Sequence, residues 1–214
     1  MIKVAIYDLD KTLVRRATFT PFLAFAARRL TPGRLALMPV WVLLMIGYRI
    51  GFYDRTRLKT MGMRLMLGRR ELAELQAIGR EFADAHLDSA GWIEGVIAMV
   101  EEDRSAGRRL AIATAAFEFY ARAFAEKLRI DEVIATRWDG STIPGGNCYG
   151  TAKCNRVADW LGEDPDNAGM RFVSDSFADE PLLELADDPV FVTQSTAKKK
   201  RAEARGWRVI DGSL

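Results

Sequence analysis

The chain begins with a short apolar run that ends in two carboxylates. Residues 4–7, Val-Ala-Ile-Tyr, suit a buried central strand, and Asp8 and Asp10 follow directly, separated by one residue. In a parallel α/β sheet the carboxyl ends of the strands form the ligand crevice. Acids at such a strand end are therefore candidates for chemistry; the alternative is that they are ordinary solvated acids. The chain's other Asp-x-Asp, residues 164–166, lies in a polar stretch and is assigned no function.

From Trp92 onward, strand-like and helix-like segments alternate. The expected strands are 110–114, 133–136, 171–174, 190–193 and 207–210, and the expected helices are 93–106, 117–128, 151–161, 180–186 and 196–205. The glycine-rich stretch 138–149 predicts a hairpin. Strands that alternate with helices predict an α/β fold with a doubly wound, mostly parallel, Rossmann-like sheet.

Residues 15–88 lack that alternation, because the signals within them are helical. Thr20-Pro21 predicts a helix start, Thr31-Pro32-Gly33 a break, and Asp54 the cap of a helix that ends near Gly68; another helix spans roughly 70–87. We therefore expect a core domain formed by residues 1–14 and 89–214, with an all-helical cap inserted at 15–88. A chain of 214 residues is long enough for this arrangement.

Two later segments carry groups that can bind phosphate. Thr114 and Ala115 end an expected strand, where a hydroxyl and backbone N–H groups can hold phosphate oxygens. The alternative is that Thr114 caps the helix that follows. Lys153 opens a helix after Tyr149-Gly150, and for this residue the alternative is a solvated surface lysine.

A second pair of acids, Asp175 and Asp179, follows the expected strand 171–174. In order along the chain, the four segments resemble the four motifs of the haloacid dehalogenase (HAD) superfamily, beginning with Asp-x-Asp-x-Thr at residues 8–12. The last segment, Asp-Ser-x-x-Asp-x-Pro-Leu-Leu, is similar to subfamily IB, the phosphoserine-phosphatase-like branch whose helical cap follows the first motif. The resemblance covers about 1–14 and 90–195. Many members have glycine after the second Asp, where this chain has Lys11.

The resemblance implies a Mg²⁺-dependent phosphomonoester hydrolase that acts through an aspartyl-phosphate intermediate. Asp8 would be the nucleophile, and Asp10 would protonate the leaving oxygen and later activate water. Asp8, the backbone carbonyl of Asp10, and Asp175 would be the metal ligands.

The remaining roles follow from the same resemblance. Asp179 would support the metal site through a water or orient Lys153. Thr114, Ala115 and Lys153 would bind the phosphoryl oxygens.

The charge of the chain is distributed unevenly. Between Lys11 and Arg70 there are thirteen basic residues and one acid, Asp54, whereas the net charge of the whole chain is only +2. Residues 35–53 are apolar apart from Arg49, and arginines flank them on both sides. Such a segment fits a helix pair in the interface of an anionic membrane. The alternative is that the apolar run packs within the cap and the arginines are solvated.

This pattern resembles the phosphatidylglycerophosphate phosphatases of subfamily IB, so an anionic lipid phosphate is the leading substrate. The stretch Arg15-Arg16-Ala17-Thr18 lacks the early acid with which phosphoserine phosphatases bind an amino group, which argues against a phosphoamino acid. Two alternatives stay open: a soluble phosphatase for a small metabolite such as a sugar phosphate, and a non-catalytic membrane-surface module. Nucleic acid is not expected as a partner, because a long uncharged run separates the arginines.

The cellular compartment is predicted from the low number of cysteines and histidines and from the N-terminal sequence. Two cysteines, Cys148 and Cys154, are too few for a disulfide framework, and His86 alone does not make a zinc site. The N-terminus does not read as a secretory signal. We expect a cytoplasmic protein with peripheral contact to the inner face of the plasma membrane.

Overall fold

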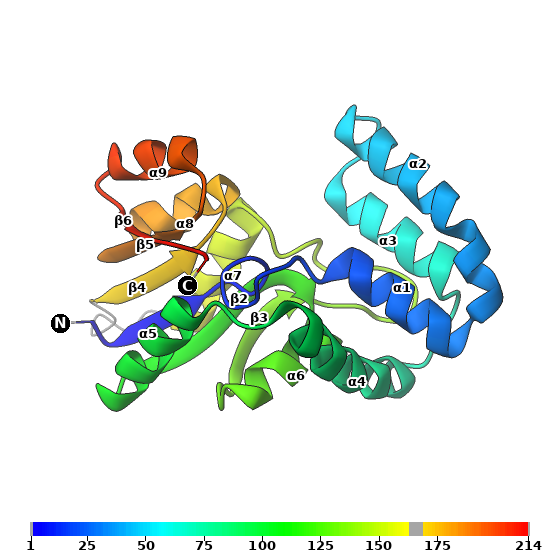
Figure 1. Cartoon of the computed structure of the whole chain (residues 1–214), viewed down its shortest axis with the longest axis horizontal. Helices are drawn as coiled ribbons and strands as arrows, with labels where there is room; N and C mark the ends of the chain where they lie inside the picture. The colour runs from blue at the N-terminus through cyan, green and yellow to red at the C-terminus, as the bar shows by residue number, and fades with distance from the viewer. Residues whose placement is uncertain (1, 163–168, 214) are drawn as a thin grey trace.

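The computed structural model describes residues 2–162 and 169–213. In this part of the chain, six parallel strands form one sheet in the order β3-β2-β1-β4-β5-β6 (Figure 1). The strands are β1 (Val4–Tyr7), β2 (Arg109–Phe117), β3 (Glu132–Thr136), β4 (Met170–Ser174), β5 (Asp188–Val192) and β6 (Arg208–Ile210). The α/β, doubly wound fold class is confirmed. The second Asp-x-Asp, at 164–166, lies outside the described residues.

Helices cover both faces of the sheet. Alternate residues of β1 enter different cores: Ala5 and Tyr7 belong to the larger apolar cluster, Val4 and Ile6 to the smaller one. All four are buried, which explains why the strand is a continuous apolar run. The helices of the core are α5 (Glu94–Ser105), α6 (Glu118–Lys127), α7 (Thr151–Leu161), η3 (Phe177–Asp179), α8 (Glu180–Leu185) and α9 (Thr196–Glu203).

The position of β1 determines where a ligand can bind. β1 lies between β2 and β4, and the strand order reverses between β1 and β4. In open parallel sheets, ligands bind beyond the carboxyl ends of the strands at this reversal point. Asp8 directly follows β1 there, and its backbone N–H donates to the carbonyl of Val173 on β4 at 2.9 Å.

The segment between β1 and α5 is helical, as predicted. It contains α1 (Phe19–Leu30), a 3₁₀ helix η1 (Pro32–Leu37), α2 (Met38–Arg49), α3 (Arg55–Met66) and α4 (Leu72–Ala90). We call these elements the helical insert. Helices α1 to α3 extend away from the sheet, whereas α4 runs along α6 of the core (Figure 1).

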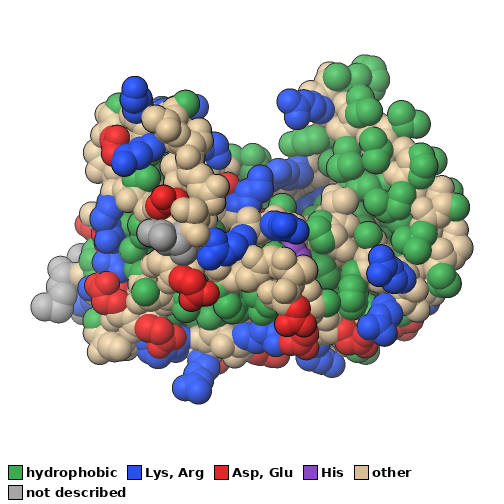
Figure 2. Space-filling model, viewed as in Figure 1, with side chains coloured by type: hydrophobic (Ala, Val, Ile, Leu, Met, Phe, Trp, Pro, Cys, Tyr) green, Lys and Arg blue, Asp and Glu red, His purple; other side chains and the backbone are tan. Residues whose placement is uncertain are grey.

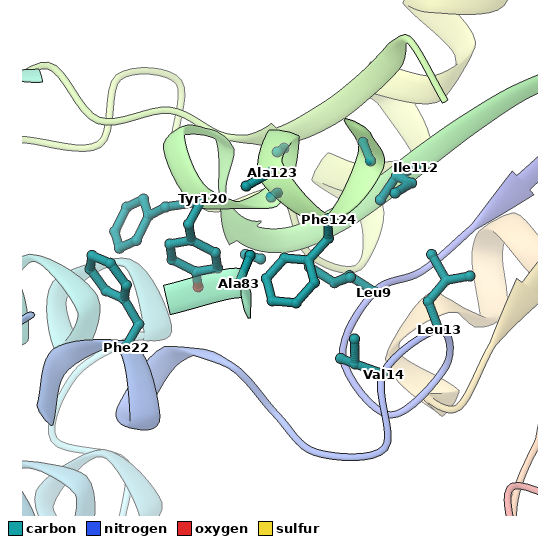
Figure 3. Packing of buried hydrophobic residues seen from close by; sticks show 14 of the residues in the cluster. Leu9, Leu13, Val14, Phe22, Ala83, Ile112, Tyr120, Ala123 and Phe124 are labelled. Carbon is teal, nitrogen blue, oxygen red and sulfur yellow. The ribbon is translucent and has the colours of Figure 1, made fainter. Parts of the chain in front are cut away.

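Aromatic packing attaches the insert to the core. Phe22 of α1 stacks on Tyr120 of α6 with ring centroids 4.8 Å apart (Figure 3). Phe82 of α4 packs edge-on against both rings. A Cβ at Gly79 would lie 2.9 Å from the Phe119 carbonyl oxygen, so the approach of α4 to α6 requires glycine there. The buried His86 packs beside Phe82 in the same group of rings.

Two local predictions were wrong. Helix α1 begins at Phe19 with Thr18 at the N-cap position, rather than at Thr20-Pro21, because the Thr18 side chain bonds to Asp10 instead of capping. Residues 138–149 form an irregular loop and not a hairpin. Side chains hold this loop: Asp139 accepts from the backbone of Thr142 at 2.7 Å, and Arg156 donates to the carbonyls of Gly145 and Gly146.

Candidate active site

Lys153 is a buried cation at the centre of the site. Gly150, with φ +56°, turns the chain into α7 and places Lys153 in its first turn, only 1 % exposed. Its Nζ donates to Asp8 Oδ1 at 3.1 Å and to Asp179 Oδ2 at 2.7 Å. Burial alone would lower the pKa of this lysine, but the two carboxylates outweigh burial and raise it. The alternative of a solvated surface lysine is therefore wrong.

Asp179 is fixed by two donors and keeps one oxygen unused. Its Oδ2 accepts from Lys153 and from Ser174 Oγ, each at 2.7 Å. Its Oδ1 is buried and has no hydrogen-bond partner. The sequence left two roles open for Asp179, to orient Lys153 or to support the metal site through a water. The hydrogen bond to Lys153 agrees with the first role.

Thr114 does not end its strand. β2 continues to Phe117 and bulges: Ala113 pairs with Ile134, but Phe117 pairs with Thr136. Four steps along β2 thus match two along β3, which leaves Thr114 to Ala116 out of register. Bulges of this kind occur next to active sites, where they redirect groups of the chain. The residue at the N-cap position of α6 is Phe117, so the capping alternative for Thr114 is wrong.

Thr18 is a site residue that sequence reasoning missed. Asp10 Oδ1 accepts from the Thr18 backbone N–H at 2.9 Å and from its hydroxyl at 2.7 Å, and Thr18 is fully buried. The hydroxyl also lies 3.2 Å from Tyr120 Oη. Thr18 therefore fixes the carboxylate of Asp10. Asp10 and Thr18 both lie in the segment between β1 and α1, where no helix or strand period relates side chains, so no pattern indicated this contact.

Lys11 and Asp175 lie beside these groups. Lys11 has φ +59°, a left-handed conformation that favours glycine, which gives a physical reason for the glycine that many family members carry at this position. Asp175 is near Lys198, whose Nζ donates to the Asp175 carbonyl at 3.1 Å. The Lys198 side chain is partly exposed, and its Nζ lies 3.9 Å from Asp175 Oδ2.

The seven predicted site residues line one pocket of about 210 Å³, at the carboxyl ends of the strands. They are Asp8, Asp10, Thr114, Ala115, Lys153, Asp175 and Asp179. Burial raises the pKa of Asp8 to about 7; Lys153 opposes that rise, and the neighbouring acids add to it. Burial also raises the pKa of Asp175. Four carboxyl groups thus line the pocket, against the three cationic side chains of Lys11, Arg55 and Lys153.

The excess of carboxylates fits a divalent cation. No three His, Cys, Asp or Glu side chains are grouped as a metal cage within residues 2–162 and 169–213. The predicted Mg²⁺ site does not need three such side chains, because its ligands are two carboxylates and a backbone carbonyl. Mg²⁺ keeps several waters as its remaining ligands. The unpartnered Asp179 oxygen and the raised pKa values of Asp8 and Asp175 agree with a cation there.

A larger apolar pocket of about 480 Å³ adjoins the first and lies within the helical insert. Its walls include Phe19, Trp41, Met45 and Leu58. Asp10, Ala17, Arg55 and Ala115 line both pockets. Figure 2 shows the hollow between the core and the insert, with Lys and Arg side chains at its floor. A substrate with its phosphoryl group near Asp8 could extend its leaving group into the insert.

Comparisons with known proteins agree with this architecture. The chain matches the haloacid dehalogenase-like hydrolase family over residues 5–184. A curated relative from Streptomyces azureus, called inhibition of morphological differentiation protein, is 26% identical over 217 residues, covering 97% of this chain and 77% of the relative.

Solved structures show the same fold. A protein of unknown function from Bordetella pertussis Tohama I superposes with a TM-score of 0.85 at 28% identity, covering 99% of each chain. A substrate-bound phosphoserine phosphatase superposes with a TM-score of 0.61 at 16% identity, covering 98% of this chain and 93% of the other. With the family match over most of the chain, the protein belongs to the haloacid dehalogenase-like hydrolase family, and its fold is like that of phosphoserine phosphatase.

Proposed function

We propose that the protein is a Mg²⁺-dependent phosphomonoester hydrolase in which Asp8 is the nucleophile. The observation that carries the proposal is the buried contact of Lys153 with Asp8 and Asp179, beside Asp10 and Asp175 in one pocket. Catalysis of phosphoryl transfer depends mainly on positioning the reacting groups and neutralising the charge of the phosphoryl oxygens. The pocket offers a carboxylate to attack phosphorus and a cation beside it.

Each site residue has its own role in the two steps of the proposed reaction. The Asp8 carboxylate attacks phosphorus and the ester oxygen leaves, so that an aspartyl phosphate forms. Asp10, held by Thr18, protonates the departing oxygen and then takes a proton from the water that cleaves the intermediate. Lys153 and the backbone of the β2 bulge at Thr114 and Ala115 neutralise the phosphoryl oxygens.

The metal would be held by Asp8, the backbone carbonyl of Asp10, and Asp175. Bound there, Mg²⁺ would supply charge neutralisation for the phosphoryl group. It would also lower the cost of ionising Asp8, whose pKa burial raises to about 7.

Asp175→Asn is expected to abolish most of the effect of Mg²⁺. Mg²⁺ at about 100 times its Kd should stabilise the wild type by about 2.7 kcal/mol, a rise of roughly 5–10 °C in Tm. The variant should lose most of that rise, and its hydrolysis of p-nitrophenyl phosphate should need far more Mg²⁺. Asp88→Asn, at an exposed position of α4, is the matched control. Wild-type hydrolysis that EDTA leaves unchanged would contradict the metal proposal.

For the substrate, we propose an anionic lipid phosphate such as phosphatidylglycerophosphate. Large apolar side chains are exposed on α2 and the turn after it: Val40, Val42, Leu43, Ile46, Ile50 and Phe52. Figure 2 shows this apolar surface on the insert. Basic residues flank it, among them the exposed Arg49 and Arg57. Apolar side chains with arginines around them suit the interface of an anionic membrane.

The helical insert would contact the membrane peripherally, without crossing it. No described helix is long and apolar enough to cross a membrane. Trp41 of the apolar run is buried inside the insert, while Leu43 and Ile50 are exposed, so the run divides between packing and exposure. This division supports a helix that lies on a membrane surface with one face down.

Leu43→Glu is expected to weaken binding to anionic vesicles roughly tenfold, because a leucine that enters the interface is replaced by an acid. Leu185→Glu is the control, since Leu43 and Leu185 are both 65 % exposed but Leu185 lies on α8, in the core. Co-sedimentation with phosphatidylglycerol vesicles at low salt measures the effect. No sedimentation of the wild type would remove the lipid proposal and favour a soluble substrate.

A further inference from the structure

The ammonium group of Lys59 lies where the insert meets the core. Lys59 is on α3 and only 5 % exposed. Its Nζ donates to the backbone carbonyl of Ala115 in the β2 bulge and to Asn147 Oδ1, the latter at 3.1 Å. The ring of Phe117 faces it, with the ring centroid 4.7 Å from Nζ. The ammonium is thus held in place from the core side.

The charge of this lysine has no counter-charge in contact with it. Both of its hydrogen-bond acceptors are neutral, and Lys59 forms no ion pair within residues 2–162 and 169–213. Burial lowers its pKa to about 7, and the nearby charge of Asp10 offsets only part of that effect. An ammonium has three N–H donors, and the two acceptors account for two of them. A buried cation is costly unless an anion pairs with it.

Lys59 also lines the wall of the apolar pocket that adjoins the catalytic pocket. It lines the apolar pocket of the insert together with Asp10 and Ala115, and these two residues also line the catalytic pocket. A group that extends from the leaving oxygen of a substrate at Asp8 into this pocket would therefore meet Lys59 as well as the apolar walls at Phe19 and Leu58.

We propose that Lys59 selects the substrate by binding a second negative charge on the leaving group. The inference rests on the proposed phosphatase function. The substrate class is a phosphomonoester whose leaving group carries an anionic group close to the ester and an apolar chain beyond it. The contacts of Lys59 with Ala115 and Asn147 hold the ammonium ready for that anion.

The test compares two long-chain substrates in mixed micelles with Mg²⁺. Phosphatidylglycerophosphate carries a phosphodiester in its leaving group, and hexadecyl phosphate carries no second anion. Lys59→Gln keeps hydrogen-bond donors but removes the charge, and should raise KM for the first substrate about tenfold or more. For hexadecyl phosphate, KM and kcat should stay within about twofold. Lys59→Arg should retain the preference, and Lys199→Gln, the same chemical change at an exposed position of α9, should change neither substrate.

Equal losses on both substrates would overturn the inference, because Lys59 would then act on the transferred phosphoryl group or on the fold. Lys59→Met separates these causes: its Tm should not fall, since an uncompensated buried charge is removed. A fall in Tm with equal losses would make Lys59 a structural residue. Wild-type enzyme that hydrolyses p-nitrophenyl phosphate but neither lipid would overturn the inference and leave the phosphatase proposal intact. Wild-type enzyme that hydrolyses none of the three would overturn both.

Discussion

Asp8→Asn is expected to lower kcat by about 10⁴-fold or more while the protein stays folded. The neutral amide cannot attack phosphorus, and no other described carboxylate at the end of β1 is hydrogen-bonded to Lys153. Asp8 is buried against β4, and burial raises its pKa to about 7. An uncharged side chain of the same shape therefore suits the metal-free site, and the Tm of the variant at pH 8 should not fall.

The measurement is single-turnover hydrolysis of p-nitrophenyl phosphate with Mg²⁺, alongside circular dichroism. Asp88→Asn applies the same chemical change at an exposed position and should leave kcat unchanged. Activity of the Asp8 variant within tenfold of the wild type would show that another group attacks phosphorus.

Lys153→Met should lower kcat/KM by about 10²–10³-fold, since it removes the cation that faces the phosphoryl oxygens. It should also destabilise the fold by roughly 3–5 kcal/mol at neutral pH, because Asp8 and Asp179 lose their buried partner. The pKa of Asp8 should rise further in the variant, since Lys153 is the charge that lowers it.

The loss of stability should depend on pH. Asp8, whose pKa is already raised to about 7, takes up a proton in the folded variant as pH falls, so the destabilisation should shrink below that pKa and grow as pH rises. Urea unfolding at pH 5 and pH 8 measures this difference. Lys199→Met, at an exposed position of α9, is the control. A variant as stable as the wild type at pH 8 would contradict the role of Lys153 as the counter-charge of the site.

The part of the site that the sequence predicted consists of groups at strand ends and helix starts. Asp8 follows a continuous apolar strand, and Lys153 follows a glycine turn into a helix; both are local patterns. Because parallel strands bring their carboxyl ends to one edge, Asp175 and Asp179 could be expected beside Asp8 without knowledge of any contact. The sheet was predictable for the same reason.

The part that the sequence did not predict depends on contacts between distant segments. The bulge at Thr114 appears only when β2 pairs with β3, so the strand seemed to end early. Thr18 and Lys59 were overlooked because their roles come from the neighbours that the fold gives them, Asp10 and Ala115. The loop 138–149 is shaped by side-chain bonds from other elements, which turn signals cannot reveal. The division into core 1–14 and 89–214 and cap 15–88 stays a prediction.

The most direct test of the central claim is to trap the covalent intermediate. Enzyme mixed with a ³²P-labelled phosphomonoester and Mg²⁺ should be quenched in acid within one turnover, digested and sequenced by mass spectrometry. We expect the label on the peptide that contains Asp8, released by hydroxylamine as an acyl phosphate, and absent from Asp8→Asn. Label on a different residue, or rapid hydrolysis with no protein-bound label at any quench time, would contradict nucleophilic attack by Asp8.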